Sequence, residues 1–163
     1  MSTPPLRIAP AGEDDAGEIL TVQRAAYLAE AQLYGDPFLP PLIETLDQLR
    51  RALTGTDTLV LKAMRGARLV GAVRGTFGGR TCLVGRLAVA PDAQGQGVGT
   101  RLLRALEERA AARADSCALF TGHLSDAGLR LCRRLGYTET HRERLAAHLT
   151  VVHMRKPLVS GDS

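Results

Sequence analysis

A chain of 163 residues is most simply one domain, and 45% hydrophobic with 23% charged residues is the composition of an ordinary globular protein. Aromatic residues make up only 4% and tryptophan is absent, which argues against a stacking surface for single-stranded nucleic acid. The sequence holds no run of 18 apolar residues, so no membrane-spanning helix is expected. A formal net charge of +4 fits three classes of partner: nucleic acid, acidic surfaces and phosphate-bearing small ligands.

The cysteine and histidine positions give no sign of a metal site. The cysteines show neither C-x-x-C nor metal-ligand spacing, and an odd number in apolar surroundings is typical of reduced thiols in the cytoplasm. These cysteines are Cys82, Cys117 and Cys132. Three of the histidines are read as structural because they lack metal spacing: His141, His148 and His153. The N-terminus does not show the charged region and apolar core of a signal peptide, so we expect a cytoplasmic protein without a metal.

The N-terminal third is predicted to hold one strand and two helices. A short strand near 6–8 precedes the acidic cluster 13–15, and acidic residues favour the first turn of a helix, so we predict a helix near 13–31. The proline-rich stretch 34–41 cannot continue a helix and is expected to form a loop. Apolar residues at helical spacing then predict a second helix that ends at about Leu53.

The rest of the chain alternates between strands and helices. Strands at 58–63, 69–77 and 81–89, joined by short glycine-containing turns, predict an antiparallel meander. The later elements are predicted as a helix from about 97 to 113, a strand at 117–121, a helix near 126–135, and strands near 138–145 and 149–155. We expect a single domain over residues 1–157 and a frayed tail over 158–163.

The segment from Leu87 to Thr100 reads as an apolar strand, a turn, three alternating glycines and the start of a helix. Glycines let a ligand approach the backbone, and the first N–H groups of a helix have no intrahelical partner and favour an anion. A phosphate ligand is therefore predicted; the alternative is a glycine-rich turn without a ligand. A P-loop requires a lysine directly after its last glycine, and no lysine follows Gly99. The spacing G-x-G-x-G also differs from the dinucleotide fingerprint G-x-G-x-x-G.

The pattern Gln94-x-x-Gly97-x-Gly99 after a Leu-Ala-Val strand resembles the pyrophosphate-binding signature (Q/R)-x-x-G-x-(G/A) of the GNAT superfamily, the acetyl-CoA-dependent N-acetyltransferases. The order of predicted elements is also similar to that of the family over almost the whole chain. The resemblance implies the GNAT acyl-CoA N-acyltransferase fold, an α/β (α+β) architecture with a central mixed, mostly antiparallel twisted sheet flanked by helices. It also implies acetyl-CoA as cosubstrate, an amine-bearing small molecule or peptide as partner, and the option of a homodimer.

A second segment, Ser125–Tyr137, resembles the family pattern N-x-x-A-x-x-x-Y-x-x-x-G-(F/Y). By position, Ser125 stands where the family has an asparagine that contacts the pantetheine arm. Cys132 stands where the family has a tyrosine that often acts as general acid toward the departing thiolate, and it also borders the cofactor. A thiol is a weak donor on a shorter side chain, so Cys132 is either this acid or a small buried hydrophobe.

The resemblance assigns most cofactor contacts to the backbone. N–H groups of the strand before the glycine loop would bind the thioester and pantetheine, and they belong to Leu87, Ala88 and Val89, with Val89 the candidate for the thioester oxygen. The N–H groups of the loop would hold the pyrophosphate. These loop residues are Gln94, Gly95, Gln96, Gly97, Val98, Gly99 and Thr100.

The remaining catalytic candidates have no motif of their own. His123, at the end of a predicted strand, is either a base that deprotonates the amine or an ordinary hydrogen-bonded residue. Tyr34, with Glu30 and Glu44, borders the segment that often forms the acceptor wall in this family, and it is the third catalytic candidate. Arg86 is either an ion-pair partner or a substrate anchor.

The leading prediction is an N-acetyltransferase that transfers the acetyl group of acetyl-CoA to a primary amine of a small molecule or peptide by direct attack on the thioester. The alternative is an acyl-CoA-binding module with weak or no catalytic activity, because the family's asparagine and tyrosine are replaced. A nucleic-acid binder ranks last, since the chain has neither an aromatic surface nor helix-turn-helix spacing. The sequence leaves open the acceptor, the acid and base, the acyl-chain preference and the oligomeric state.

Overall fold

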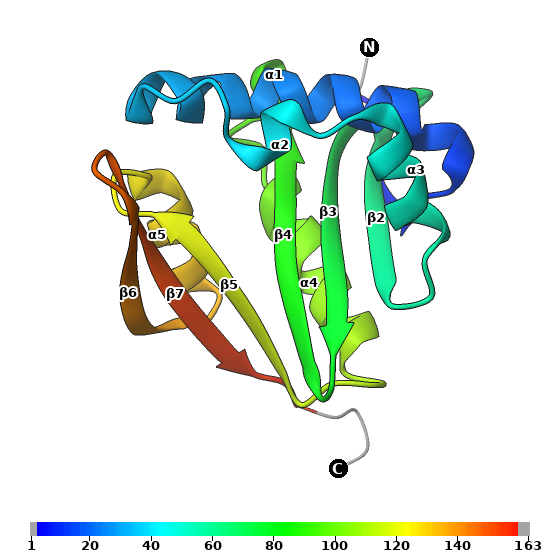
Figure 1. The fold of residues 1–163 in the computed structure, drawn as a ribbon. Helices are drawn as coiled ribbons and strands as arrows, with labels where there is room; N and C mark the ends of the chain where they lie inside the picture. Colours follow the sequence, from blue (N-terminus) through cyan, green and yellow to red (C-terminus); the bar gives the residue numbers. More distant parts are fainter. Residues whose placement is uncertain (1–2, 160–163) are drawn as a thin grey trace.

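Seven strands form one continuous sheet in the computed structural model, which describes residues 3–159 (Figure 1). The strand order is β1-β2-β3-β4-β5-β7-β6, and all neighbouring pairs are antiparallel except β4 and β5. The sheet confirms the predicted mixed, mostly antiparallel architecture and the β2–β4 meander. The strands are β1 (Leu6–Pro10), β2 (Thr58–Arg65), β3 (Arg68–Gly78), β4 (Thr81–Val89), β5 (Ser116–Gly122), β6 (Thr138–Ala146) and β7 (Leu149–Pro157).

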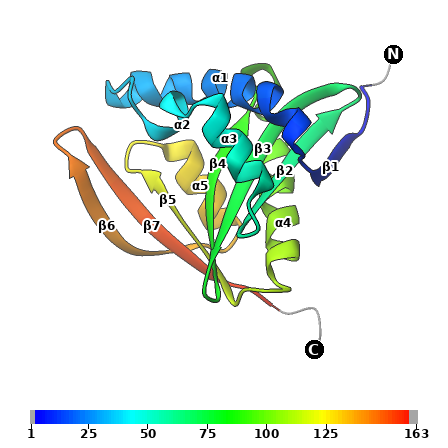
Figure 2. The ribbon, with the colours of Figure 1, turned by 45° about the vertical axis from the view of Figure 1, so that its right-hand side comes forward.

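Helices cover both faces of this sheet. The first three lie on one face, and the last two lie on the other (Figures 1 and 2). The helices are α1 (Ala16–Tyr34), α2 (Pro40–Ile43), α3 (Leu46–Thr54), α4 (Val98–Ala110) and α5 (Asp126–Arg134). Short 3-10 turns at Glu13–Asp15 and Pro91–Ala93 precede α1 and the glycine loop. The order of elements is the one that the sequence predicted, except that two helices, α2 and α3, stand where one was expected.

Helix α1 extends to Tyr34 rather than ending near residue 31. The 3-10 turn before it is closed by the Asp15 carboxylate, which accepts a hydrogen bond from the Gly12 N–H at 2.8 Å. It ends at Gly35, whose φ of 63° is the left-handed conformation that glycine adopts readily. The extra turn carries Tyr34 to the end of β5, where its hydroxyl accepts a hydrogen bond from the Leu124 N–H at 3.0 Å.

The single helix predicted up to Leu53 is wrong, because the structure contains two helices separated at Glu44 and Thr45. Thr45 caps α3 in a capping box: its hydroxyl accepts from the Gln48 N–H at 3.1 Å, and the Gln48 side chain accepts from the Thr45 N–H at 2.9 Å. These two bonds pair N–H groups that have no intrahelical partner at the start of α3. A new helix therefore begins at Leu46, although the spacing of apolar residues continues through the break. The break places Glu44 over the sheet.

Strands β4 and β5 pair only at their beginnings. Residues 81–83 face residues 116–118 in parallel register, and no pairing between the two strands continues beyond Leu83. Farther along β4, two residues oppose the single Val73 of β3, and one of them, Arg86, has a φ of 52°, a bulge conformation that is rare outside glycine. The two strands therefore separate toward their C-terminal ends, as Figure 1 shows.

Two apolar clusters hold the sheet between its helices. The larger one packs α4 and α5 against the sheet and includes Leu102 and Leu106, which are fully buried. The smaller one packs α1 and α3 against the opposite face and includes Ile19 and Leu49. Packing on both faces of β3 and β4 fixes the position of the edge at which β4 leaves β5.

No helix within residues 3–159 is both long and apolar enough to cross a membrane. After β7, the Leu158 N–H donates to the Asp115 carbonyl at 2.7 Å, so the expected frayed tail does not begin at Leu158. The last part of that predicted tail, residues 160–163, lies outside the described residues.

The close packing of β3 against β4 and α4 leads to a stability prediction. A Cβ at Gly71 would lie 2.9 Å from the Ala88 carbonyl oxygen and 3.1 Å from side-chain atoms of Leu102 and Val98. Gly71→Ala is therefore expected to lower the free energy of unfolding by about 2 kcal/mol, since overpacking forces backbone and side chains apart. Gly85→Ala is the control, because a Cβ there meets no atom within 4 Å. Urea unfolding measures both, and equal stability of the two variants would contradict the packing described.

Candidate active site

Among residues 3–159, the edge of β4 that turns away from β3 has no strand partner beyond Leu83. The Ala90 N–H donates to the Val70 carbonyl of β3 at 2.8 Å, and Ala88 lies opposite Ala72. Because backbone groups alternate along a strand, Ala88 faces β3, whereas Leu87 and Val89 direct theirs to the other edge. Of the three predicted strand contacts, the geometry therefore favours the N–H groups of Leu87 and Val89 and turns that of Ala88 toward β3.

The glycine loop joins this edge to α4. Gly95 and Gly97 have φ values of 76° and 83°, and the Gln94 side-chain amide donates to the Val89 carbonyl at 3.2 Å. The first N–H groups after Gly97 have no intrahelical partners, and no side chain of residues 3–159 caps them. A Cβ on either left-handed glycine would meet no atom within 4 Å among the described residues. The backbone N–H groups of the loop and of the first turn of α4 are therefore accessible to an anion.

A hydrogen-bonded group of three side chains lies where β5 ends and α5 begins. The Tyr34 hydroxyl and the Ser125 hydroxyl lie 2.7 Å apart, and Ser125 donates to a carboxylate oxygen of Glu30 at 2.7 Å. Because Ser125 has one proton and gives it to Glu30, Tyr34 donates to Ser125 in this arrangement. Tyr34 and Ser125 are buried, whereas Glu30 is half-buried on α1. The sequence candidates Tyr34 and Ser125 are thus brought together.

Gly122 makes this arrangement possible. A Cβ at residue 122 would overlap the Tyr34 hydroxyl. The last residue of β5 must therefore be glycine for Tyr34 to reach Ser125, a requirement that no sequence motif indicated.

His123 lies beside Tyr34, with ring centroids 5.9 Å apart. Its Nδ1 lies 2.9 Å from the Thr150 carbonyl oxygen and 3.3 Å from the Thr150 nitrogen, whose N–H can donate to it. Accepting from that N–H places the ring proton on Nε2, whereas donating to the carbonyl places the proton on Nδ1 and leaves Nε2 without one. An imidazole in this second tautomer can accept a proton at Nε2. His123 and Tyr34 are therefore neighbours, as a catalytic pair requires.

Cys132 lies apart from this group. Its side chain is buried in the larger apolar cluster on the inner face of α5, and burial together with the charge of Glu107 raises the pKa of its thiol to about 11. No hydrogen bond to the thiol occurs within residues 3–159. This environment fits the small buried hydrophobe that the sequence offered as the alternative for Cys132; its role as an acid stays a prediction.

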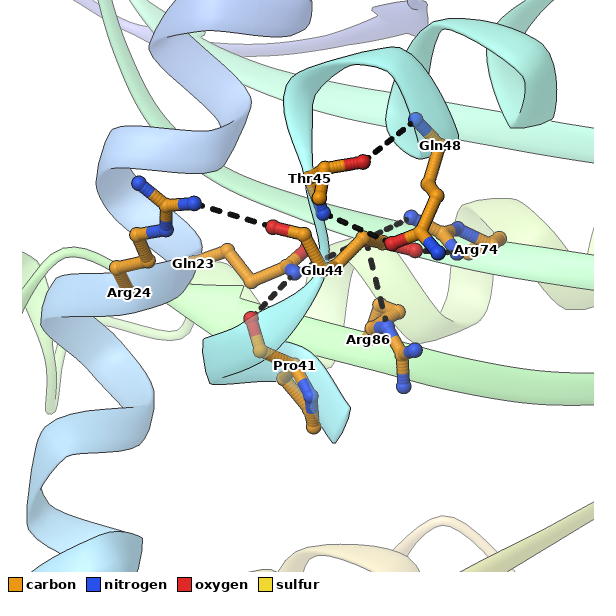
Figure 3. A network of polar contacts seen from close by, with 8 residues as sticks. All are labelled: Gln23, Arg24, Pro41, Glu44, Thr45, Gln48, Arg74 and Arg86. Atoms are coloured by element: carbon orange, nitrogen blue, oxygen red, sulfur yellow. Dashed lines mark hydrogen bonds and ion pairs between the residues drawn. The ribbon is translucent and has the colours of Figure 1, made fainter. Parts of the chain in front are cut away.

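A polar network under α2 and α3 surrounds Glu44 (Figure 3). The Glu44 carboxylate accepts two hydrogen bonds from Arg74, at 2.8 and 2.9 Å, and one from Gln23 at 3.1 Å. Gln23 also donates to the Pro41 carbonyl at 2.8 Å. The guanidinium of Arg86 approaches Glu44 only through Nε, at 3.6 Å. The expected ion-pair partner of Arg86 is therefore present, but Arg74 holds it more closely.

The carboxyl group of Glu44 is strongly acidic. Burial raises its pKa, but hydrogen bonds from Arg74 and Gln23 and the charges of Arg74 and Arg86 outweigh burial and lower the pKa to about 2. Such a carboxylate is a poor proton acceptor at neutral pH. Glu44 therefore organises the wall of the site rather than deprotonating an amine.

Sequence reasoning missed the partners in this network. Gln23 is a buried polar residue within the first predicted helix, and Arg74 lies in the middle of a predicted strand. The pairing of Arg74 with Glu44 spans 30 residues, and no local pattern indicates it. A charged residue inside an otherwise apolar strand was the one available signal, because a buried charge requires a partner.

A cavity of about 420 Å³ adjoins this network. It is lined by Pro40, Ile43, Glu44, Thr45, Gln48 and Arg86. The cavity therefore lies between α2, α3 and β4, on the same face as α1 and three residues along β4 from Val89. It borders the region in which the sequence placed the acceptor wall.

The sequence profile of the family described as acetyltransferase (GNAT) domain matches residues 25–158. The matched segment contains the open edge of β4, the glycine loop and the segment from Ser125 to Tyr137. A search of curated proteins found no significant match.

Solved structures share the fold over nearly the whole chain. The ribosomal-protein-S18-alanine N-acetyltransferase from Escherichia coli is 17% identical with a TM-score of 0.79, covering 98% of each chain. PaiA N-acetyltransferase from Thermoplasma acidophilum, in complex with coenzyme A, is 18% identical with a TM-score of 0.75, covering 96% of this chain and 99% of its own. YncA from Salmonella typhimurium, a putative acetyltransferase with its cofactor acetyl-CoA, is 22% identical with a TM-score of 0.73, covering 97% and 96%.

The ion pair of Glu44 predicts a pH-dependent contribution to stability. Its folded pKa of about 2 lies below the ordinary value of 4.5, so the stabilisation is complete above about pH 5 and is lost as the pH falls toward 2. Glu44→Gln is expected to lower the free energy of unfolding by about 3 kcal/mol at pH 7, because Arg74 is left without its counter-charge. Urea unfolding from pH 7 to pH 2.5 should show the two proteins converging; a constant difference would contradict the prediction.

Proposed function

We propose that this chain, which belongs to the GNAT family of acetyltransferases, transfers the acetyl group of acetyl-CoA to a primary amine of a small molecule or peptide. The observation that carries the proposal is the open edge of β4 leading directly into the uncapped start of α4. One edge supplies donors for a thioester, and the adjoining loop supplies donors for a diphosphate. The coenzyme A and acetyl-CoA complexes of proteins with the same fold support this choice of cosubstrate.

The cofactor contacts in this proposal are mainly backbone donors. The N–H groups of the glycine loop and the first turn of α4 would bind the pyrophosphate, assisted by the positive end of the helix dipole. The N–H groups of Leu87 and Val89 would bind the pantetheine and the thioester oxygen. Ser125, at the start of α5, would contact the pantetheine arm from the β5 side.

The reaction would be a direct transfer. The neutral amine attacks the thioester carbon, forming a C–N bond and a tetrahedral oxyanion, and the C–S bond then breaks to release the thiolate. The Val89 N–H, on the open edge of β4, would stabilise the oxyanion without reorganisation. His123 Nε2 would accept the proton that the amine loses, directly or through water.

Tyr34 is the proposed proton donor to the departing thiolate. Its hydroxyl proton now points to Ser125, and the Leu124 N–H donates to its oxygen, so a phenolate formed after proton transfer would be hydrogen-bonded. Cys132 occupies the family's tyrosine position and is as buried as Tyr34, but it packs in the apolar cluster and makes no side-chain hydrogen bond among residues 3–159. We therefore assign the proton to Tyr34 first and keep Cys132 as the second candidate.

An acyl-CoA-binding module with weak or no catalytic activity is the second candidate function. The burial of the Cys132 thiol favours it, because the family's usual acid position then holds no accessible donor. Cofactor binding without release of thiol on any amine would distinguish this function. We also propose a cytoplasmic location, supported by three free, buried cysteines, and a homodimer as the assembly to test first.

Acetyl-CoA binding is the first test of the proposal. Titration calorimetry is expected to give micromolar affinity, and Gly97→Ala is expected to weaken it about tenfold or more, because a side chain in the left-handed conformation distorts the donor loop. Gly79→Ala is the control, since it places the same strain (φ 59°) in the β3–β4 turn, away from the loop. Absence of acetyl-CoA binding by the unaltered protein would refute the proposed function.

The choice between Tyr34 and Cys132 is tested by kinetics. Tyr34→Phe is expected to lower kcat about 100-fold at pH 7, within the usual range for loss of a general acid, with little change in acetyl-CoA affinity. Cys132→Ala is expected to lower the free energy of unfolding but to change kcat less than threefold. Thiol release with an accepted amine measures both, and the reverse ranking would assign the proton to Cys132.

A further inference from the structure

The cavity between α2, α3 and β4 contains hydrogen-bond donors in excess of acceptors. Both oxygens of the Glu44 carboxylate are occupied by Arg74, and one also accepts from Gln23. Gln48 uses its side-chain oxygen to accept from the Thr45 N–H, which leaves its NH₂ group as a donor. The described lining therefore offers no free carboxylate to a ligand, but it offers amide and guanidinium donors.

Arg86 supplies the charge of this cavity. Its Nε is buried without a hydrogen-bond partner, and its terminal nitrogens have none among residues 3–159. Figure 3 shows these terminal nitrogens directed away from Glu44, while Arg74 takes both carboxylate oxygens. Two guanidinium groups thus share one carboxylate. Arg74 takes both carboxylate oxygens, so the terminal nitrogens of Arg86 are available to bind a negatively charged ligand.

The backbone holds Arg86 in this direction. The bulge in β4 gives Arg86 a φ of 52° and places its side chain on the face covered by α1 and α2. A non-glycine residue in the left-handed region costs energy and persists only where the surroundings fix it. Val89 is three residues farther along the strand, a backbone separation of at most roughly 10 Å at about 3.3 Å per residue of extended chain. The two residues therefore lie within the length of a small molecule along one strand.

We propose that the acceptor is a small primary amine that carries a carboxylate, with the carboxylate bound by Arg86 and the Gln48 amide in this cavity and the amine directed toward Val89. A planar guanidinium binds a carboxylate through two parallel hydrogen bonds, which a lysine cannot reproduce. Pro40 and Ile43 supply an apolar wall for the carbon chain between the two groups. The inference rests on the proposed function and narrows its acceptor to one chemical class.

The test is a panel of matched amines with the full chain and acetyl-CoA. Glycine, β-alanine, γ-aminobutyrate and 6-aminohexanoate, together with several α-amino acids, are each compared with the corresponding carboxamide, which keeps the size but removes the charge. Thiol release gives kcat and KM, and titration calorimetry on the protein saturated with coenzyme A gives binding without turnover. At least one carboxylate is expected to be favoured over its amide by about 10- to 100-fold, mainly in KM or Kd.

Substitutions then assign that preference to Arg86. Arg86→Gln is expected to reduce the ratio of carboxylate to amide to within about twofold of one, and Arg86→Lys is expected to restore only part of it. Arg109→Gln is the control, because it removes the same charge from the exposed last turn of α4 on the opposite face. Thermal unfolding and acetyl-CoA affinity verify that each variant is folded and binds the cosubstrate.

The outcomes separate the inference from the proposed function. Equal use or equal binding of carboxylates and amides, or a preference that survives Arg86→Gln, overturns the inference and leaves the acetyltransferase intact. Failure of the unaltered protein to bind acetyl-CoA overturns the proposed function and the inference with it. A carboxylate preference that Arg86→Gln removes and Arg109→Gln keeps supports both.

Discussion

The separation of β4 from β5 after three paired residues is the constraint on which the rest of the site depends. A strand edge without a neighbour exposes N–H and C=O groups that proteins normally pair. Here the opening is fixed at its base, where Cys82 and Cys117 are fully buried at paired positions of the two strands. Core packing therefore holds the edge open, so the Val89 N–H lies on an open edge without any rearrangement of the strands.

The bulge at Arg86 links this edge to the cavity beside it. One extra residue in β4 changes the direction of the strand before Val89 and turns a guanidinium toward α2. A half-buried guanidinium next to Arg74 requires a counter-ion. The break between α2 and α3 supplies it, because Glu44 lies there within 2.8 Å of Arg74 and 3.6 Å of Arg86. Breaking such a pair is costly, whereas the pair itself adds little net stability. The network is therefore better explained by the position that it imposes on Arg86 than by stability.

The sequence predicted the elements that local patterns determine. Strand segments joined by short glycine-containing turns located the meander, and the glycine loop located both the start of α4 and the expected phosphate site. The split between α2 and α3 was missed although its capping box, Thr45 to Gln48, is readable in the sequence, because the leucine spacing continues through it. The contact of Tyr34 with Ser125 spans 91 residues and depends on the absence of a side chain at Gly122, so only the folded sheet could show it.

The departures from the family pattern at residues 125 and 132 lie in different surroundings. Cys132 is buried in the apolar cluster against α5, and its thiol has no hydrogen-bond partner among the described residues. The Ser125 hydroxyl lies 2.7 Å from the hydroxyl of Tyr34, which reaches the start of α5 from α1. A phenol is thus present near the expected pantetheine arm, but it comes from another element of the fold. Proton donation needs a group of suitable pKa at the sulfur and not a particular position in the chain, so moving the phenol from α5 to α1 is compatible with the same chemistry.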